Sequence, residues 1–208
     1  MSWLETTFQK LRNHFIEVTV RPPADRRDRV ALGSRFDSIP EDVEYYYAQC
    51  NGITVGLQDD AVGHLFPLDR SLARMPVAVD CEPERRFVPI RGDGCGDYDC
   101  VVLGDGPAEG AVVFWDHEVC EGPAYLLGGC FSSYLQMWAD HLVNRYLPNG
   151  EEDRRYRPLS LAEYPWVGEP KLRHPWPFNE EWMASRDARA ARILNEPAAR
   201  SWLLRQDE

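Results

Sequence analysis

Apolar residues near the amino terminus recur at helical spacing. Four of them are separated by four, three and four positions and so fall on one face of a helix: Leu4, Phe8, Leu11 and Phe15. Residues 21–35, which follow, hold five arginines and a Pro-Pro pair. Because charged residues and proline interrupt regular structure, we expect this stretch to be an exposed connection.

A second helix is marked by clear start and stop signals. Residues 38–41 read Ser-Ile-Pro-Glu, the form of a capping box, in which the serine and glutamate side chains bond the first free backbone amides. The apolar face of this helix consists of four residues: Val43, Tyr46, Tyr47 and Cys50. Asn51 and Gly52 are expected to end it, because both residue types tolerate the left-handed backbone of a helix stop.

From Ile53 onward the spacing changes to that of strands. Short runs of β-branched and aromatic residues alternate with turns rich in glycine, aspartate and proline. Five runs are predicted to be strands: residues 53–57, 64–68, 87–90, 98–103 and 111–115. Strands joined by short turns pair antiparallel. Between residues 68 and 87 the pattern is weaker, and it favours one short strand at 76–79.

A third helix is predicted from near Cys130. One face of it carries large apolar side chains: Phe131, Leu135, Trp138, Leu142 and Tyr146. The composition changes at Glu151, where a charged run leads into a stretch rich in proline and tryptophan. Beyond that stretch we expect a helix from Asn179 to about Asn195 and a short one that begins at Pro197.

Together these elements predict an α+β fold with a twisted, mainly antiparallel sheet against which helices pack. We assign residues 1–150 to an α+β domain and residues 151–208 to a helical extension packed on it. Trp166, Trp176 and Trp182 lie in the extension, and leaving three tryptophans in water would be costly. A chain of 208 residues, 44% of them hydrophobic, is long enough for one well-filled core.

The cellular compartment is indicated by two features of the chain. No apolar run approaches the roughly 20 residues needed to cross a bilayer. The first residues lack the basic and then apolar order of a signal peptide, so we expect the protein to stay in the cytoplasm. The six cysteines should then be reduced, and since none forms a C-x-x-C pair, most are expected to be small buried apolar residues.

Negative charge is concentrated in the middle of the chain. The net charge is −11, and residues 92–144 hold nine acids but no lysine or arginine. Such a segment repels nucleic-acid phosphate and anionic lipid and attracts basic partners, so we expect neither nucleic acid nor a membrane as partner. The alternative interpretation is an acidic surface that only aids solubility.

Residues 91–100 combine three glycines with three aspartates, which is similar to a calcium loop. The similarity fails because positions six and twelve, counted from Asp93, are Tyr98 and Gly104 instead of glycine and glutamate. Neither a phosphate loop nor a catalytic motif occurs. A further set of metal-binding residue types matches no ligand spacing: His64, His117, Cys95, Cys100 and Asp116. The sequence therefore favours a protein without enzymatic activity, cofactor or metal.

Five short motifs follow one another in a set order. They are Ile-Pro-Glu-Asp at 39–42 with Cys-Asn-Gly at 50–52, His-Leu-Phe-Pro-Leu at 64–68 with Phe-Val-Pro-Ile at 87–90, Gly-Asp-Gly-Cys-Gly-Asp-Tyr-Asp at 92–99, Gly-Ala-Val-Val-Phe-Trp-Asp-His-Glu at 110–118, and Phe-Ser-Ser-Tyr-Leu at 131–135. This order resembles the SUKH superfamily, which includes bacterial immunity proteins and fungal regulators of cell-wall synthesis. Two features depart from the family pattern: the cysteines at 95 and 100, and the extension after residue 150.

The resemblance implies an α+β fold and a role without catalysis. Bacterial members are immunity proteins that neutralise a cognate toxin, often a nuclease, by binding it. A basic toxin domain would be attracted by the acidic segment, which agrees with the charge distribution. The expected contact residues come from the glycine-rich segment and the strand after it: Asp93, Asp97, Tyr98, Asp99, Asp116 and Glu118.

Three alternatives stay open at this point. The glycine-rich loop can be a turn that the fold needs, with acids that are merely exposed. The protein can be a regulatory module, as fungal members suggest, that docks other proteins through residues 151–208. It can also be a small metal-binding enzyme that uses the cysteine–aspartate cluster. The sequence identifies neither the partner nor the oligomeric state.

Overall fold

The computed structural model describes residues 2–36, 38–56, 62–79, 86–104, 106–117, 123–153, 176–177 and 179–203. Within these ranges the helices are α1 (Trp3–His14), α2 (Arg26–Gly33), α3 (Glu41–Gln49), α4 (Leu68–Val79), α5 (Phe131–Arg145), α6 (Glu180–Arg186), α7 (Ala188–Asn195) and α8 (Pro197–Leu203). The strands are β1 (Val18–Val20), β2 (Ile53–Val55), β3 (Gly63–Leu65), β4 (Arg86–Gly92), β5 (Tyr98–Leu103), β6 (Val112–Trp115) and β7 (Pro123–Gly128).

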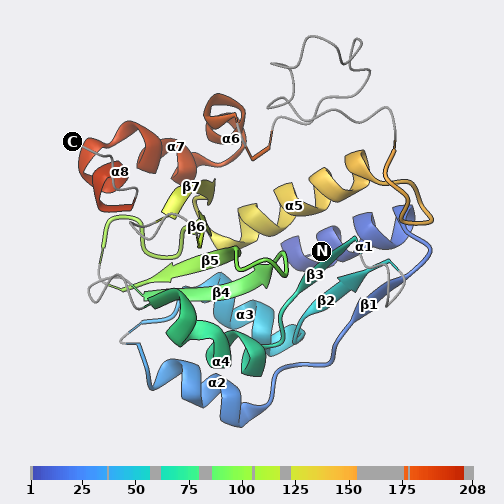
Figure 1. The fold of residues 1–208 in the computed structure, drawn as a ribbon, viewed down its shortest axis with the longest axis horizontal. Coiled ribbons are helices and arrows are strands. Elements are labelled where there is room, and N and C mark those ends of the chain that lie inside the picture. Colours follow the sequence, from blue (N-terminus) through green and yellow to red (C-terminus); the bar gives the residue numbers. More distant parts are fainter. Residues whose placement is uncertain are drawn as a thin grey trace.

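The strands form two antiparallel sheets. One sheet has the order β1-β2-β3 and the other the order β4-β5-β6-β7. The two are linked where the amide of Phe66, just after β3, donates to the carbonyl of Ile90 in β4 over 2.7 Å. The predicted α+β class, with a mainly antiparallel sheet, packed helices and a helical carboxyl-terminal segment, is confirmed (Figure 1).

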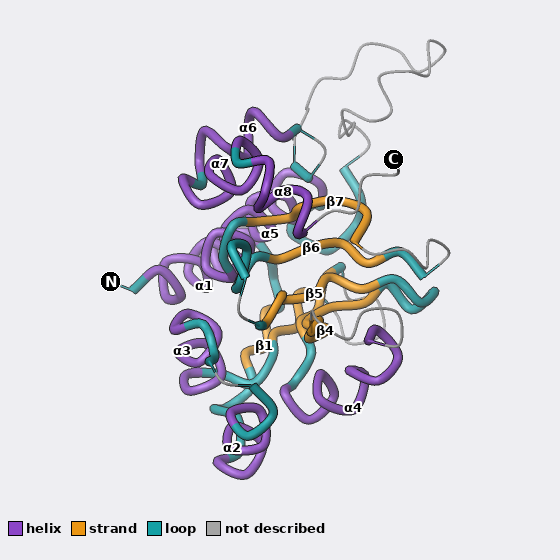
Figure 2. The backbone as a smooth tube through the Cα atoms, turned by 90° about the vertical axis from the view of Figure 1, so that its left-hand side faces the viewer, coloured by secondary structure: helices purple, strands orange, loops and turns teal. Residues whose placement is uncertain are grey.

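Strand β5, inside the four-stranded sheet, is buried on both faces. All six residues of β5 are buried, although successive side chains of a strand point to opposite sides. Tyr98 faces α4, where Arg74 donates to its hydroxyl, and Asp99 faces α5, where it accepts from the hydroxyl of Tyr134. Figures 1 and 2 show α6, α7 and α8 near β6 and β7, with α4 next to β4 at the opposite end and α2 beyond α4.

Helix α1 and helix α5 agree with the hydrophobic spacing. The four residues that predict the amino-terminal helix are all buried. The side chain of Ser2 caps α1 by accepting from the amide of Glu5. Along α5, the predicted apolar face is buried from Phe131 to Leu142, and Tyr146 is partly buried at the helix end.

The stretch at residues 21–35 is mostly exposed, as expected, but it is not only a connection, because α2 lies within it. Asp25 caps this helix through its side chain, which accepts from the amide of Arg27 over 2.7 Å. Leu32 is buried on its inner side. The many arginines suggested a solvated link, but arginine is also a good helix former, and one cap and one buried leucine are enough to place the helix.

Two further expectations are corrected. The short strand at 76–79 is wrong, because α4, which begins at Leu68, continues through these residues to Val79. The capping box at 38–41 does not form. Pro40 is the N-cap residue of α3 and makes no side-chain hydrogen bond to the helix, and the hydroxyl of Ser38 donates to the carboxylate of Glu109 instead. The helix does stop as expected, and Gly52 adopts a left-handed φ of 102°.

The described part of the carboxyl-terminal extension contacts the rest of the chain. The indole of Trp176 donates to the carbonyl of Leu127 in β7 over 2.8 Å. The expected single helix from Asn179 to Asn195 is instead two helices, because the chain turns at Asp187 between α6 and α7. Trp166 lies outside the described residues. Among the helices that the structure describes, none is long and apolar enough to cross a bilayer.

Candidate functional site

The glycine-rich segment forms the turn between β4 and β5, next to the end of β6. The sheet register pairs Tyr98 with Trp115, so the residues just outside this pair meet at the same end of the sheet. There, Asp97 Oδ1 lies 2.7 Å from Nδ1 of His117. We call residues 93–97 together with Asp116 and His117 the acidic loop. Glu118, the last of the expected contact residues, lies outside the described residues.

Asp93 holds the shape of the acidic loop. Its carboxylate accepts hydrogen bonds from the amides of Cys95, over 2.7 Å, and Asp97, over 3.3 Å. Its slight burial by itself would raise the pKa of Asp93, but these hydrogen bonds outweigh that effect and lower it. Gly96 has a φ of 122° and packs so tightly on His117 that an added Cβ would lie 2.9 Å from the ring. Asp93 is therefore both exposed and structural.

Asp97, Asp116 and His117 form a group that the sequence reasoning did not find. One potential ligand atom from each lies within 4.8 Å of the others. Two carboxylates and an imidazole are acceptable donors for a divalent cation. Asp97 already accepts from both the ring and the amide of His117, however, so the group is also satisfied by itself. The predicted strands could have indicated this group, since antiparallel pairing of residues 98–103 with residues 111–115 brings residues 97 and 116 together.

Tyr98 and Asp99 were expected near the contact surface, but both side chains lie in the interior. Tyr98 is 7% exposed and Asp99 is 2% exposed. The carboxylate of Asp99 pairs with Arg91 over 3.0 Å and accepts from the hydroxyl of Tyr134 over 2.6 Å. The alternation of β5 explains the difference: helices cover both faces of this strand, so neither of the two residues can point to solvent.

Burial and the charge of Asp99 together shift the pKa values of its neighbours. Burial by itself would lower the pKa of Arg91, but the adjacent Asp99 carboxylate more than offsets this and raises it. The pKa of Tyr134 is raised, first by burial and then by the negative charge of Asp99. The three groups form one interior network, which stabilises the sheet against α5 and is not a contact surface.

The cysteine–aspartate cluster that the third alternative requires is not assembled among the described residues. Cys100 is fully buried on the face of β5 opposite Asp99, and burial raises the pKa of its thiol. Cys95 is exposed at the tip of the acidic loop. A thiol that stays protonated is a poor nucleophile and a poor metal ligand. Cys100, like Cys50, is a small buried apolar residue, whereas Cys95 is exposed and Cys130 half-buried.

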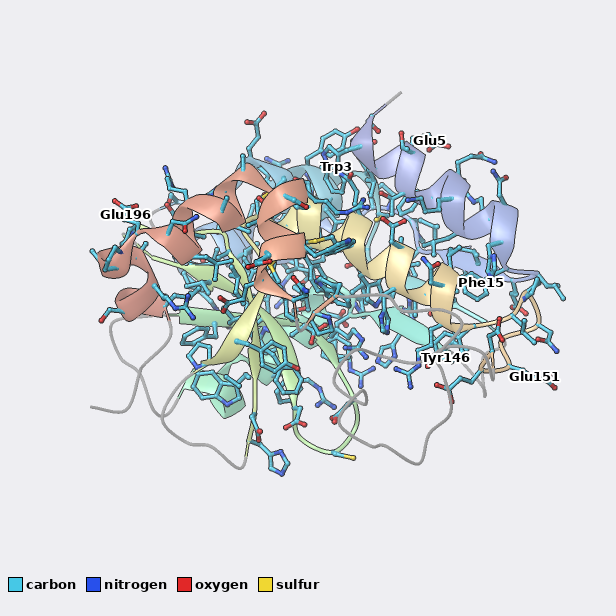
Figure 3. All side chains as sticks on the ribbon, turned by 90° about the horizontal axis from the view of Figure 1, so that it is seen from above. Trp3, Glu5, Phe15, Tyr146, Glu151 and Glu196 are labelled. Carbon is cyan, nitrogen blue, oxygen red and sulfur yellow. The ribbon has the colours of Figure 1, made fainter. Side chains whose placement is uncertain are left out.

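A larger concave surface lies elsewhere, between the start of α1, the first half of α3 and the turn before β6. It is an open groove of about 920 Å³. Four acidic residues line it, two of them exposed and two half-buried: Glu41, Glu44, Asp42 and Glu109. Two aromatic residues, Trp3 and Tyr45, also line it, and Figure 3 shows Trp3 at the start of α1. We call this surface the acidic groove.

Two of the four carboxylates in the acidic groove are fixed by hydrogen bonds. Asp42 accepts from the amide of Ser132 at the start of α5 over 2.7 Å. Glu109 accepts from the hydroxyl of Ser38, and its backbone carbonyl accepts from Arg189 of α7. The groove is therefore built from segments that are far apart in the sequence, and the carboxyl-terminal helices contribute its basic residue.

The aromatic side of the groove is also ordered. The rings of Trp3 and Tyr45 are 6.0 Å apart at their centroids and tilted by 53°. Trp3 also packs edge-on against Phe131, with centroids 6.4 Å apart. Carboxylates pair with lysine and arginine side chains, and aromatic faces attract the same cations. Chemically, the groove is suited to basic side chains of another protein.

The sequence reasoning missed the acidic groove. The acids at 41, 42 and 44 are what any helix start favours, since negative charge there offsets the helix dipole. Glu109 was counted only as part of the acidic segment. Comparison with models of known protein families gives no match for this chain, and comparison with curated proteins gives none either. The site is therefore interpreted from its own geometry.

Proposed function

We propose that this chain is a non-enzymatic binding protein that neutralises a basic protein domain, such as a nuclease-type toxin, by docking it in the acidic groove. One observation supports this proposal above the others. Four acidic residues and two aromatic residues, from α1, α3 and the turn before β6, line one open groove of about 920 Å³. A surface of this kind recognises a basic side chain by charge and by its flat cationic face.

The charge of the whole chain favours the same kind of partner. Domains that grip nucleic-acid phosphate carry lysine and arginine, so they are attracted to a protein of net charge −11. Attraction at a distance raises the rate of association, and the carboxylates in the groove imitate the negative charge of substrate phosphates. Binding of this type blocks a nuclease without chemistry.

The resemblance of the motif order to the SUKH superfamily supports the proposal independently of the groove. Immunity proteins of that superfamily act by binding, in the compartment where the toxin would otherwise do damage. A cytoplasmic location follows as part of the proposal. The acidic loop contributes in a secondary way: Asp93 and Asp116 remain candidate contacts, while Tyr98 and Asp99 support the sheet from within.

A protection assay tests the proposal. The chain is co-expressed with candidate basic toxin-type domains, starting with any that a neighbouring gene encodes, and survival of the cells is measured. A groove variant carries Glu41→Gln, Glu44→Gln and Glu109→Gln. The control variant removes the same charge elsewhere, at three exposed acids: Glu17→Gln, Glu151→Gln and Glu196→Gln. Figure 3 shows Glu151 and Glu196 far from Trp3 at opposite ends of the molecule.

We expect the wild type and the control variant to protect the cells and the groove variant to fail. Equal protection by the groove and control variants would place the contact elsewhere, and Asp116→Asn would then test the acidic loop. Absence of any complex between the two purified proteins would contradict the proposed function altogether.

A regulatory module is the second candidate, because α7 supplies Arg189 to the groove. In that case the extension shapes a docking surface for other cellular proteins. The same assay separates the two functions, since a regulatory module binds without protecting cells from a toxin.

A further inference from the structure

Two arginines of α4 stand beside the acidic loop without a paired carboxylate among the described residues. Arg70 and Arg74 are four positions apart and so lie on the same side of the helix. The guanidinium carbon of Arg70 is 4.2 Å from the centre of the Phe66 ring, and that of Arg74 is 5.5 Å from it. Arg74 also donates to the hydroxyl of Tyr98 over 2.7 Å. Stacking on the ring holds both side chains in place.

The positive charges of Arg70 and Arg74 lie close together, and neither is paired with a carboxylate among the described residues. The pKa of Arg70 is lowered, first by its slight burial and then by the neighbouring charge of Arg74. Asp93 lines the same pocket, but its carboxylate is bonded to the amides of its own loop. The residues that line this pocket therefore carry two arginine charges and one carboxylate charge, in a chain of net charge −11. Like charges four positions apart on a helix repel, so a bound anion would stabilise this arrangement.

The space beside the two arginines is concave. A pocket of about 310 Å³ is lined by both arginines, by Tyr98 and His64, and by the glycine-rich turn at 92–96. A guanidinium that stacks by its face keeps its N–H groups free at the edge, where they match the two oxygens of a carboxylate or phosphate. The pocket therefore has the donors, the charge and the room for one such group.

We propose that Arg70 and Arg74 form a binding site for an oxyanion, a carboxylate or phosphate group that is held between their guanidinium edges. This site lies outside the acidic groove and selects the opposite charge, so it goes beyond the proposed function. A ligand or partner that occupies it presents an acidic group to α4.

Titration of the purified full chain with small anions tests the site. Inorganic phosphate and acetate are added separately at constant ionic strength, and the NMR signals of the His64 ring and the glycines of the turn are followed. Arg70→Gln and Arg74→Gln remove the proposed ligands one at a time. Arg12→Gln is the matched control, because Arg12 also stacks on a phenylalanine, at 5.7 Å from the Phe8 ring, but has Glu5 beside it at 3.8 Å.

We expect saturable shifts with at least one of the anions. Each α4 variant should weaken binding roughly ten- to a hundredfold, as the loss of a charge-assisted hydrogen bond predicts, and the Arg12 variant should bind like the wild type. Shifts with phosphate alone identify a phosphoryl ligand, and shifts with acetate as well identify a carboxylate.

Arg74→Gln could disturb the fold because Arg74 donates to Tyr98. Arg70→Gln then tests the site by itself, because Arg70 is exposed and has no hydrogen bond to the interior among the described contacts. The site is overturned if neither anion gives saturable shifts, or if Arg70→Gln binds them as tightly as Arg12→Gln does. In that case the arginines only hold α4 against the sheet.

Discussion

Asp99 joins a strand to a helix through two polar contacts. Its carboxylate, 2% exposed, pairs with Arg91 of β4 and accepts from Tyr134 of α5. Removing one member of a buried charge pair leaves the other without compensation. We predict that Asp99→Asn lowers the free energy of unfolding by about 2–3 kcal/mol, less than for a fully buried pair because Arg91 is partly exposed.

Chemical denaturation of the wild type and the Asp99 variant gives this difference. Tyr134→Phe should cost less, roughly 1–2 kcal/mol, because it removes one hydrogen bond and leaves the ion pair intact. Glu17→Gln, at an exposed acid, serves as the control and should change stability by less than about 0.5 kcal/mol. An Asp99 variant as stable as this control would show that the interior network does not stabilise the fold.

His64 gives the fold a dependence on pH. The pKa of His64 is lowered by burial first, and then by the charges of Arg70, Arg91 and Arg74. The folded chain therefore takes up this proton at lower pH than the unfolded chain. Stability is complete above the unfolded pKa of about 6.5 and falls as the pH drops below it, until the folded pKa is passed.

We predict that His64→Asn flattens this loss of stability below about pH 6.5. Asp93, Cys95 and Tyr98 also line the pocket that His64 faces, and the variant leaves them unchanged. Denaturation midpoints of both proteins measured across the pH range give the result. Between about pH 7 and 8 the two curves should run parallel. Parallel curves at lower pH as well would contradict the role of His64.

At the scale of elements, the junction between β7, α5 and α7 holds the carboxyl-terminal helices in place. Asp187 caps α7 by accepting from the amides of Arg189 and Ala190, and its second oxygen accepts from the amide of Gly129. The backbone of α7 comes so close that a Cβ on Gly129 would lie 2.1 Å from the nitrogen of Ala190. Only glycine fits at this contact.

We predict that Gly129→Ala displaces α7 and costs at least about 2–3 kcal/mol of stability, as overpacking at a rigid contact does. Gly33→Ala is the matched control: nothing lies within 4 Å of an added Cβ there, and its φ is not left-handed. That control should be neutral or slightly stabilising. Denaturation and limited proteolysis measure both effects, and equal stability of the two variants would contradict the tight junction.

The elements that the sequence predicted well are those with strong local signals. The spacing of apolar residues was enough for α1 and α5, the stop signal together with an apolar face was enough for α3, and the run of β-branched residues was enough for β5. Helix α2 was missed because its arginines suggested solvent, and β1 because three residues carry too little pattern. β7 was missed because it begins at a proline and ends in glycines. Whether these segments become a helix or a strand depends on how they pack against residues that are distant in the sequence.

The candidate site could be predicted only in part for the same reason. The charge count found the acids at 93, 97 and 116, which the structure places at one end of the sheet. It could not separate them from Asp99, whose direction depends on which helices cover β5. The acidic groove depends on Trp3, Glu41 and Glu109 meeting in space, and no spacing along the chain reports that contact.

At the scale of the whole molecule, charge is distributed unevenly over the surface. A negative groove lies at the start of α1 and α3, while a pair of arginines lies on α4 beside the acidic loop. A basic partner in the groove and an anionic group at the arginines would be held at different places. Long-range attraction to a net charge of −11 is weakened by salt, whereas shape and aromatic contacts are not.

Calorimetric titration with a basic toxin-type domain from which this chain protects cells, at low and at high salt, tests the central proposal most directly. We predict that wild type and the control variant at residues 17, 151 and 196 bind in a salt-dependent way. The groove variant at residues 41, 44 and 109 should bind at least about tenfold more weakly at low salt and respond less to salt. Equal affinity and equal salt dependence of the groove and control variants would contradict the proposal that the acidic groove is where the basic partner binds.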